Sequence, residues 1–331
     1  MTARLPGQDV RTPRQDVRAP GQDVRVLYLA GIPRTGSTVL GQALGGQPDA
    51  IFVGELNFFW RRFAHRELCS CRRPLPECPF WSAVVSRAYG DLSPGRATAL
   101  AELERWVLRR QSVLALVPAR GPVRRRAGVA TMLAERAQLY RSVAEVAGAS
   151  WIVDAGKEPV FGSFLARADH VSFGTVHLVR DPRGVAFSWK KRVRSDSEPG
   201  EMPRHPAART AVDWLLQNLM VQLSLQRLSR VYVRVRYEDL VARPADIVAG
   251  ISRATGLAAT GLDAHHLGAA GLGEHHLVAG NPGVRQLAGS GLELTLDEEW
   301  RAHLSRADRL VVTAVCATLM TAYGYRVLAG R

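Results

Sequence analysis

The sequence predicts an α/β domain with a mostly parallel sheet and helices on both of its faces. Short apolar runs with strand character recur along the chain, and helical patterns of apolar residues lie between several of them. Charged or glycine-containing turns follow these runs, as at the ligand-binding edge of such sheets. The predicted strands are Val26–Leu29, Ile51–Val53, Trp151–Asp154, Val171–Val179 and Val231–Val235.

The composition is that of a globular protein with a strongly basic charge. Its 331 residues are 47% hydrophobic and carry a formal net charge of +14. Only three of the 44 basic residues are lysine, and arginine is spread over the whole length, so the charge favours anionic ligands in general and no specific nucleic-acid surface. The sequence has no apolar stretch of membrane-spanning length and no apolar signal-peptide core, and we expect a cytoplasmic protein.

The first 24 residues are expected to form a disordered arm. The unit Gln-Asp-Val-Arg occurs three times, at 8–11, 15–18 and 22–25. These units have too little apolar surface to offset the entropy lost on ordering. The folded domain is therefore predicted to cover residues 25–331, with a helical insertion around residues 60–146.

The first predicted strand leads into a loop that suits an anion. The residues Gly31-Ile-Pro-Arg-Thr-Gly-Ser-Thr have the spacing of a P-loop, except that Ser37 stands where the P-loop lysine belongs. A strand, a glycine-containing turn and a helix N-terminus aim backbone N–H groups at a bound anion. An NTPase needs that lysine for the β- and γ-phosphates, and the nearest cation here is Arg34, so we expect a ligand with a single 5′ anionic group rather than a triphosphate. An ordinary strand-turn-helix without a ligand is the alternative. The fold is predicted to be a P-loop-like three-layer α/β/α fold.

Two charged side chains follow later strands. Glu55 comes just after Ile51–Val53, and Lys157 comes just after Trp151–Asp154. The carboxyl ends of parallel strands meet at one edge of a sheet, so both side chains are expected beside the phosphate loop. Glu55 is a candidate general base, with a solvated loop glutamate as the alternative.

A second anion site is predicted after Val171–Val179. Asp181-Pro182 fits a helix start, and on that helix Ser188 and Arg192 are four residues apart and share a face. With Arg180 at the strand end, these side chains can converge on a further phosphate. A solvated basic helix face is the alternative.

The region between residues 60 and 146 carries cysteines followed by helical patterns. Helices are predicted from about residue 98 to 146, with a basic break at 118–128, and are expected to wall the acceptor side of the site. Cys69, Cys71 and Cys78, with His65, have the ligand types for a structural zinc, but their spacing departs from paired CxxC units. Buried or free thiols, or one transient disulfide, are the alternatives. Cys316 is expected in the core.

Together these segments resemble a known family. The segments GIPRTGST, RDPRGVAFSW and RYEDLV occur in the order found in sulfotransferases that use 3′-phosphoadenosine 5′-phosphosulfate (PAPS), and the resemblance spans roughly residues 25 to 285. It is closest to the branch with tyrosylprotein, carbohydrate and many bacterial sulfotransferases.

The resemblance implies a role for each candidate residue. The 5′-phosphosulfate would be held by Arg34, Thr35, Gly36, Ser37 and Thr38, and the 3′-phosphate by Arg180, Ser188 and Arg192. Glu55 would be the catalytic base, Arg34 and Lys157 would stabilise the leaving group, Tyr237 would line the nucleotide pocket, and Arg285 would belong to a loop that covers the cofactor. The chain departs from the family at Arg34, where many members have lysine, and by an extra residue before Arg285. The histidines near this loop, His265, His266, His275 and His276, could suggest metal binding, but the resemblance explains one of them as a loop position and the others are expected at the surface.

The implied reaction is sulfuryl transfer from PAPS to a hydroxyl by in-line displacement, without a metal ion. The acceptor would be a sugar, a glycolipid, a natural-product hydroxyl or a tyrosine. A P-loop kinase using ATP and Mg²⁺, with Asp154 as the acidic metal ligand, is the main alternative. A non-catalytic protein that binds nucleic acid or an acidic partner is another.

Overall fold

The fold of the protein is seen in a computed structural model that describes residues 10–11, 23–110, 112, 116, 126–191, 204–258, 276–279 and 295–327. The described strands form one sheet with the order β1-β6-β5-β2-β4-β3. All neighbouring strands are parallel except β1, which pairs antiparallel with β6. The strands are β1 (Val10–Arg11), β2 (Val24–Ala30), β3 (Ala50–Phe52), β4 (Trp151–Lys157), β5 (Val171–Val179) and β6 (Tyr232–Arg236). The predicted α/β fold with a mostly parallel sheet is confirmed.

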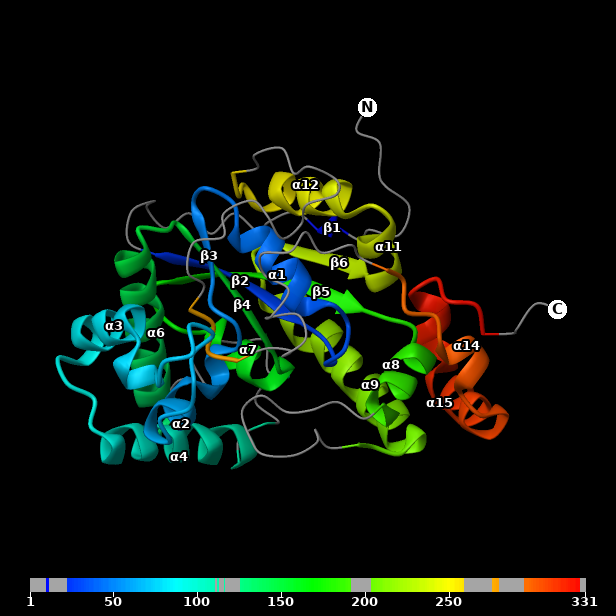
Figure 1. Cartoon of the computed structure of the whole chain (residues 1–331), viewed down its shortest axis with the longest axis horizontal. Helices are drawn as coiled ribbons and strands as arrows, with labels where there is room; N and C mark the ends of the chain where they lie inside the picture. The colour runs from blue at the N-terminus through cyan, green and yellow to red at the C-terminus, as the bar shows by residue number, and fades with distance from the viewer. Residues whose placement is uncertain are drawn as a thin grey trace.

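The helices lie around this sheet in three groups (Figure 1). The first group is α1 (Ser37–Gly45), α11 (Tyr237–Ala242) and α12 (Pro244–Thr255). The second group follows β3 and precedes β5 along the chain, and it consists of η1 (Leu56–Phe58), α2 (Phe59–Ala64), η2 (Leu75–Glu77), α3 (Pro79–Tyr89), α4 (Pro94–Arg110), α6 (Val129–Ala147) and α7 (Pro159–Leu165). The third is α8 (Pro182–Lys190), α9 (Ala207–Met220), η4 (Val221–Leu225), α10 (Gln226–Leu228), α14 (Trp300–His303) and α15 (Arg306–Ala322).

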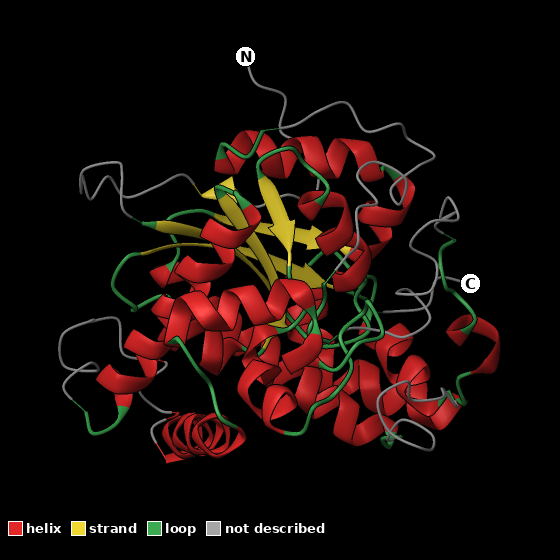
Figure 2. Ribbon diagram, turned by 60° about the vertical axis from the view of Figure 1, so that its left-hand side comes forward, coloured by secondary structure: helices red, strands yellow, loops and turns green. Residues whose placement is uncertain are grey.

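Successive side chains of β2 point to opposite faces of the sheet, and this explains why helices cover both faces. Val26 and Tyr28 face a core shared with α6 and α7, whereas Leu27 and Leu29 face a core shared with α1 and α12. A strand that is apolar on both faces must be covered on both, and Figure 2 shows helices on either side of the sheet.

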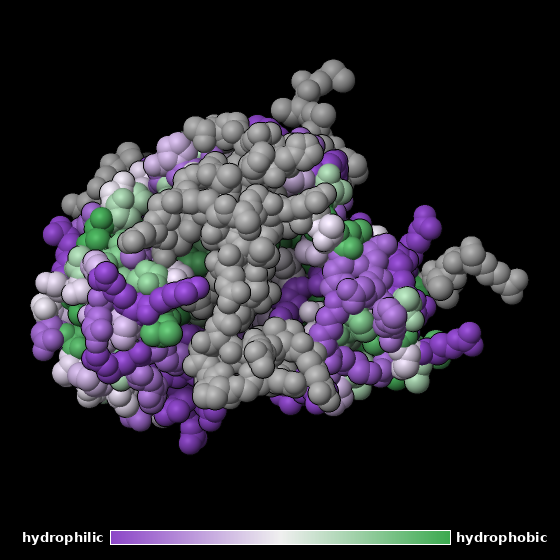
Figure 3. All heavy atoms as spheres, viewed as in Figure 1, coloured by the Kyte–Doolittle hydropathy of each residue, from purple (hydrophilic) through white to green (hydrophobic). Residues whose placement is uncertain are grey.

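A third core lies beyond the sheet, between α8, α9 and α15. Trp214 and Met320 are buried there, and Cys316 is buried with them as predicted. Figure 3 shows hydrophilic and hydrophobic residues mixed over the side of the molecule that carries α14 and α15. Among the helices that the structure describes, none is both long and apolar enough to cross a membrane.

Several boundaries differ from those predicted. Lys157 is the last residue of β4 rather than a residue after the strand, and α8 ends at Lys190, before Arg192. Within the predicted arm, Val10–Arg11 pair with β6, and most of the other arm residues lie outside the described part of the chain. The disorder of the arm therefore stays a prediction.

Candidate active site

The loop between β2 and α1 has the geometry of an anion cradle. Gly31 and Gly36 have φ angles of 134° and 83°, in the region that favours glycine. A Cβ on Gly31 would collide with the carbonyl oxygen of Leu178, and one on Gly36 would lie 3.0 Å from the ring of Tyr237. Helix α1 then starts without a side-chain cap. The first N–H groups of such a helix point at whatever anion binds there.

The side chains of the loop are held in defined places. Thr35 donates from its hydroxyl to the carbonyl of Ile32 at 2.9 Å and is buried, as are Ser37 and Thr38. Arg34 has a φ of 75° and its guanidinium lies 5.3 Å from the ring centre of Trp189 on α8. Burial lowers the pKa of Arg34 from its usual range, since a desolvated charge is disfavoured.

Glu55 and Lys157 meet at the neighbouring strand ends. The N–H of Gly31 donates to the carbonyl of Lys157 at 3.3 Å, and the N–H of Ala155 donates to the carbonyl of Gly54 at 2.7 Å. These bonds place the ends of β2, β4 and β3 side by side. The Lys157 Nζ lies 2.5 Å from Glu55 Oε1, and both side chains are largely buried. The two residues that the sequence placed at this edge therefore form an ion pair next to the loop.

A buried set of charges fixes the turn that carries Glu55. Asp154 accepts a hydrogen bond from the N–H of Leu56 at 3.3 Å and another from the hydroxyl of Tyr140. Arg136 donates to the carbonyl of Leu56 at 2.7 Å and to both carboxylate oxygens of Glu104 at 2.7 Å. Because Asp154 is fully buried and both of its oxygens accept hydrogen bonds, it is not placed as an open Mg²⁺ ligand. The kinase alternative loses its acidic metal ligand.

Asp154 makes the stability of the fold depend on pH. Burial raises its pKa to about 6 against an ordinary value of 3.8, although hydrogen bonds to Tyr140 and Leu56 lower it. The folded state therefore binds this proton more tightly than the unfolded state. Its contribution to the unfolding free energy falls as pH rises from about 4 to about 6, by up to about 3 kcal/mol, and is constant above that.

The measurement is urea unfolding of the wild type and of Asp154→Asn between pH 4 and pH 7. The unfolding free energy of the wild type, minus that of the variant, is expected to decrease over this range. A difference that stays flat would show that Asp154 does not titrate there.

Arg180 lies at the end of β5 and faces the phosphate loop. It is 5% exposed, and it donates to the carbonyl of Arg34 at 3.0 Å. Its guanidinium stacks on Tyr237, 4.4 Å from the ring centre, and the same ring covers Gly36. Asp297 accepts from Arg180 through its carbonyl at 2.9 Å and lies 3.2 Å away through its carboxylate. Arg180 and Tyr237 therefore join the loop to the second predicted anion site.

Asp297 and Lys191 are members of this site that the sequence reasoning missed. Lys191 lies 3.3 Å from the Asp297 carboxylate. Partial burial disfavours the Asp297 charge, but Arg180 and Lys191 together lower its pKa below the ordinary value. The carboxylate of Asp297 is therefore held ionised by Arg180, which is predicted to bind a phosphate, and by Lys191.

The remaining predicted residues differ in how far the structure tests them. Ser188 lies on α8, two turns after its start, and no hydrogen bond joins it to Arg180 among the described residues. Arg192 and Arg285 lie outside the described residues. Their roles stay predictions.

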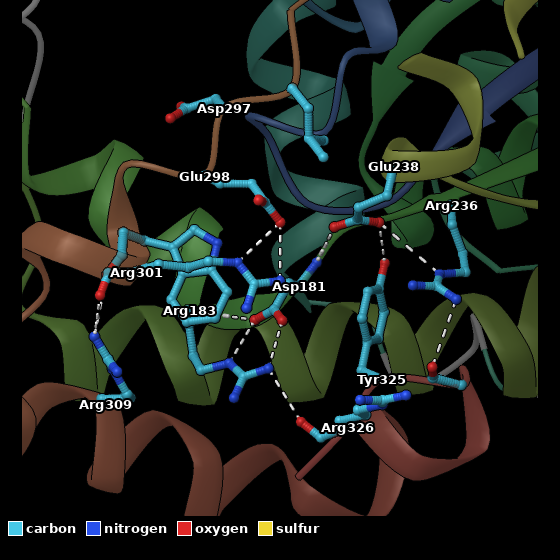
Figure 4. A pocket seen from close by; sticks show the side chains of 13 residues that line it. Asp181, Arg183, Arg236, Glu238, Asp297, Glu298, Arg301, Arg309, Tyr325 and Arg326 are labelled. Atoms are coloured by element: carbon cyan, nitrogen blue, oxygen red, sulfur yellow. Dashed lines mark hydrogen bonds and ion pairs between the residues drawn. The ribbon is translucent and has the colours of Figure 1, made fainter. Parts of the chain in front are cut away.

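A cavity of about 670 Å³ is lined by charged side chains that form ion pairs with one another (Figure 4). Arg183 donates to both carboxylate oxygens of Asp181, at 2.9 and 2.6 Å, and Asp181 also caps α8. Glu238 accepts from the N–H of Asp181 at 3.1 Å and from the Tyr325 hydroxyl at 2.8 Å. None of the predicted site residues that the structure describes lines this cavity, but Asp297 does. These bonds join the start of α8 to α11 and to the residues that follow α15.

A second cavity, of about 630 Å³, has Asn57 and Glu158 in its lining, which are near neighbours in sequence of Glu55 and Lys157. It lies between η1, α2, α4 and the start of α7, and its lining includes Phe58, Leu108, Glu158 and Phe161. His65 also lines it, and the histidine that the structure groups with the three cysteines is His276. Helices α2 and α4, which belong to the predicted helical insertion, form part of the wall of this cavity.

Comparison with known proteins supports the fold. No protein-family model matches the sequence, and no curated protein matches it significantly. The sulfotransferase domain of an olefin synthase from Synechococcus PCC 7002 is 20% identical, with a TM-score of 0.51 over 92% of this chain and 98% of that one. A sulfotransferase domain from the curacin biosynthetic pathway is 16% identical, with a TM-score of 0.47 over 92% and 98% of the two chains. A sulfotransferase from Mycobacterium avium is 13% identical, with a TM-score of 0.48 over 94% and 79%. The first likeness shows that the chain has the fold that its sequence resemblance implied.

Proposed function

We propose that the protein is a sulfotransferase that moves a sulfuryl group from PAPS to an acceptor hydroxyl. The observation that carries this proposal is the meeting of three groups at adjacent strand ends. The loop 31–38 follows β2, Glu55 follows β3, and Lys157 ends β4 in an ion pair with Glu55. The fold shared with a sulfotransferase domain supports the same function.

The two anionic ends of the donor fit two parts of the site. The glycine cradle and the uncapped start of α1 suit the 5′-phosphosulfate, because they offer N–H groups and partial positive charge. Arg180 offers a buried, fixed guanidinium for the 3′-phosphate, and Arg suits phosphate through its paired donors. Ser37 in place of a P-loop lysine is consistent with a donor that has no γ-phosphate.

The roles of the residues follow from the charges that move. The acceptor oxygen forms its bond to sulfur while the bond from sulfur to the 5′-phosphate oxygen breaks. Glu55 takes the proton of the acceptor hydroxyl. Lys157 and Arg34 stabilise the charge that develops on the departing phosphate, as fixed cations do at other transferred groups. Lys157 would leave Glu55 for the phosphate, and this exchange frees the carboxylate to act as the base.

The acceptor is proposed to bind in the cavity between α2, α4 and α7. The aromatic rings of Phe58 and Phe161 give this cavity apolar walls, and Arg61 and Glu158 add charge. Such a lining favours an acceptor with an apolar body that presents one hydroxyl to Glu55.

Thermal unfolding with adenosine 3′,5′-bisphosphate, the expected product, tests the proposal. ADP and ATP·Mg in the same buffer are the controls. A ligand at about 100 times its Kd stabilises the folded state by about 2.7 kcal/mol, which raises Tm by a few degrees. The proposal expects this shift with the bisphosphate and a smaller one with ADP. A rise in Tm with ATP·Mg alone would contradict the proposal and favour a phosphotransferase instead.

A further inference from the structure

Three cysteines and one histidine converge at a place that the proposed reaction does not use. Cys69 and Cys71 lie in the turn after α2, and Cys78 is the residue before α3. His276 comes from the segment 276–279, which is far away in the sequence. The four potential ligand atoms all lie within 4.8 Å of one another.

The distances within this cluster are those of a tetrahedral metal site. Cys78 Sγ lies 3.6 Å from Cys71 Sγ, 3.7 Å from Cys69 Sγ and 3.1 Å from His276 Nδ1. Cys69 Sγ lies 3.9 Å from the same nitrogen. Zn–S and Zn–N bonds of normal length at tetrahedral angles separate two sulfurs by about 3.8 Å and a sulfur from a nitrogen by about 3.6 Å. The ligands therefore already surround a space of the size that zinc needs.

We propose that Cys69, Cys71, Cys78 and His276 bind a structural Zn²⁺ ion. Thiolate and imidazole are soft and borderline ligands that select zinc over magnesium or calcium. Four protein ligands close the coordination sphere, as in structural rather than catalytic zinc sites. On binding, the three thiols release their protons to solvent and His276 coordinates as neutral imidazole through Nδ1, which leaves the site with a net charge of −1.

The surrounding chain is built to hold these ligands in place. The N–H of Cys69 donates to the carbonyl of Arg73 at 2.9 Å, and the N–H of Arg72 donates back to the carbonyl of Cys69 at 2.9 Å. This tight turn presents Cys69 and Cys71 on one side. The ring of His276 stacks on Phe80 at 5.2 Å, and its carbonyl accepts from Trp81 Nε1 at 3.0 Å. Such contacts orient a metal-binding histidine before the metal arrives.

The proposed zinc would join two distant parts of the chain next to the catalytic edge. The segment 276–279, orange in Figure 1, lies against the end of β3, where the N–H of Val278 donates to the carbonyl of Val53 at 3.0 Å. The N–H of Ser70 donates to the carbonyl of Leu277 at 3.2 Å. The metal would thus fasten the cysteine turn and the segment 276–279 together. This segment bonds to Val53, which is two residues before Glu55 in the sequence. This role is independent of the reaction that we propose.

The test is the metal content of the whole protein purified under reducing conditions without chelator or affinity metal. Elemental analysis and native mass spectrometry are expected to find about one zinc ion per chain. Cys69→Ser, Cys78→Ser and His276→Asn should lose the zinc. Cys316→Ser and His65→Asn are matched controls that should keep it, because Cys316 lies in another core and His65 lines the acceptor cavity.

Two further measurements keep the proposal falsifiable if the ligand variants do not fold. The zinc-loaded wild type should have a higher Tm than the chelator-treated wild type, and Co²⁺ added to the treated protein should give the visible bands of tetrahedral thiolate ligation. A wild type without zinc that also gives no such cobalt bands would overturn the proposal. A disulfide between Cys71 and Cys78 in the reduced, freshly purified protein would overturn it as well. All of these readouts are independent of sulfotransferase activity.

Discussion

Glu55→Gln is expected to lower kcat by about 10²–10⁴-fold and to leave the affinity for adenosine 3′,5′-bisphosphate nearly unchanged. Glutamine keeps the size and shape of the side chain and cannot accept the acceptor's proton. Glu55 is not among the residues proposed to contact the bisphosphate, and the glutamine side-chain carbonyl can still accept a hydrogen bond from Lys157, which lies 2.5 Å from Glu55 in the ion pair. The measurement is single-turnover sulfuryl transfer, together with calorimetric titration of the bisphosphate.

The control for this variant is Glu77→Gln. Glu77 pairs with Arg66 at the exposed surface near the cysteine turn and is not part of the site, so both its kcat and its bisphosphate affinity should match the wild type. If Glu55→Gln transfers the sulfuryl group at the normal rate, another group is the base. If it loses the bisphosphate as well as turnover, Glu55 supports the binding site and its role as the base is not established.

The features of the site that depend on local sequence could be predicted. The predicted strand Val171–Val179 has the bounds of β5, and Asp181-Pro182 does start α8. Strand-end residues such as Glu55 and Lys157 meet because parallel strands bring their carboxyl ends to one edge. A local apolar pattern and a topological rule were sufficient for these predictions.

Partners that are distant in sequence could not be predicted. Asp297 lies 117 residues from Arg180, and His276 lies 198 residues from Cys78. Nothing in the sequence spacing says that such residues meet, so the sequence pointed to the nearby His65, whereas the structure groups His276 with the cysteines. In contrast, Glu104 left a visible signal. It lies on the apolar stripe of α4 with Leu100 and Val107, and a charge on such a stripe indicates a buried partner.

Arg180→Ala is expected to remove the preference of the site for a 3′-phosphate. Arg180 is the buried cation at the end of β5, and loss of a desolvated charged partner lowers affinity on the order of 10²-fold. The wild type should bind adenosine 3′,5′-bisphosphate more tightly than AMP, which lacks the 3′-phosphate. In the variant the two ligands should bind with much more similar affinities, because the 3′-phosphate loses its buried guanidinium. Calorimetric titration of both ligands measures this difference.

Asp297→Asn gives the opposite expectation at the same place. A 3′-phosphate must displace the Asp297 carboxylate from Arg180 and Lys191, so removal of its charge should strengthen bisphosphate binding and leave AMP binding unchanged. Lys190→Ala is the neutral control. Lys190 is the last residue of α8 and the neighbour of Lys191, but it pairs with Asp308 at the surface. Equal losses of AMP and bisphosphate affinity in Arg180→Ala would instead mean that Arg180 supports the loop through the carbonyl of Arg34. The phosphate would then bind elsewhere along α8.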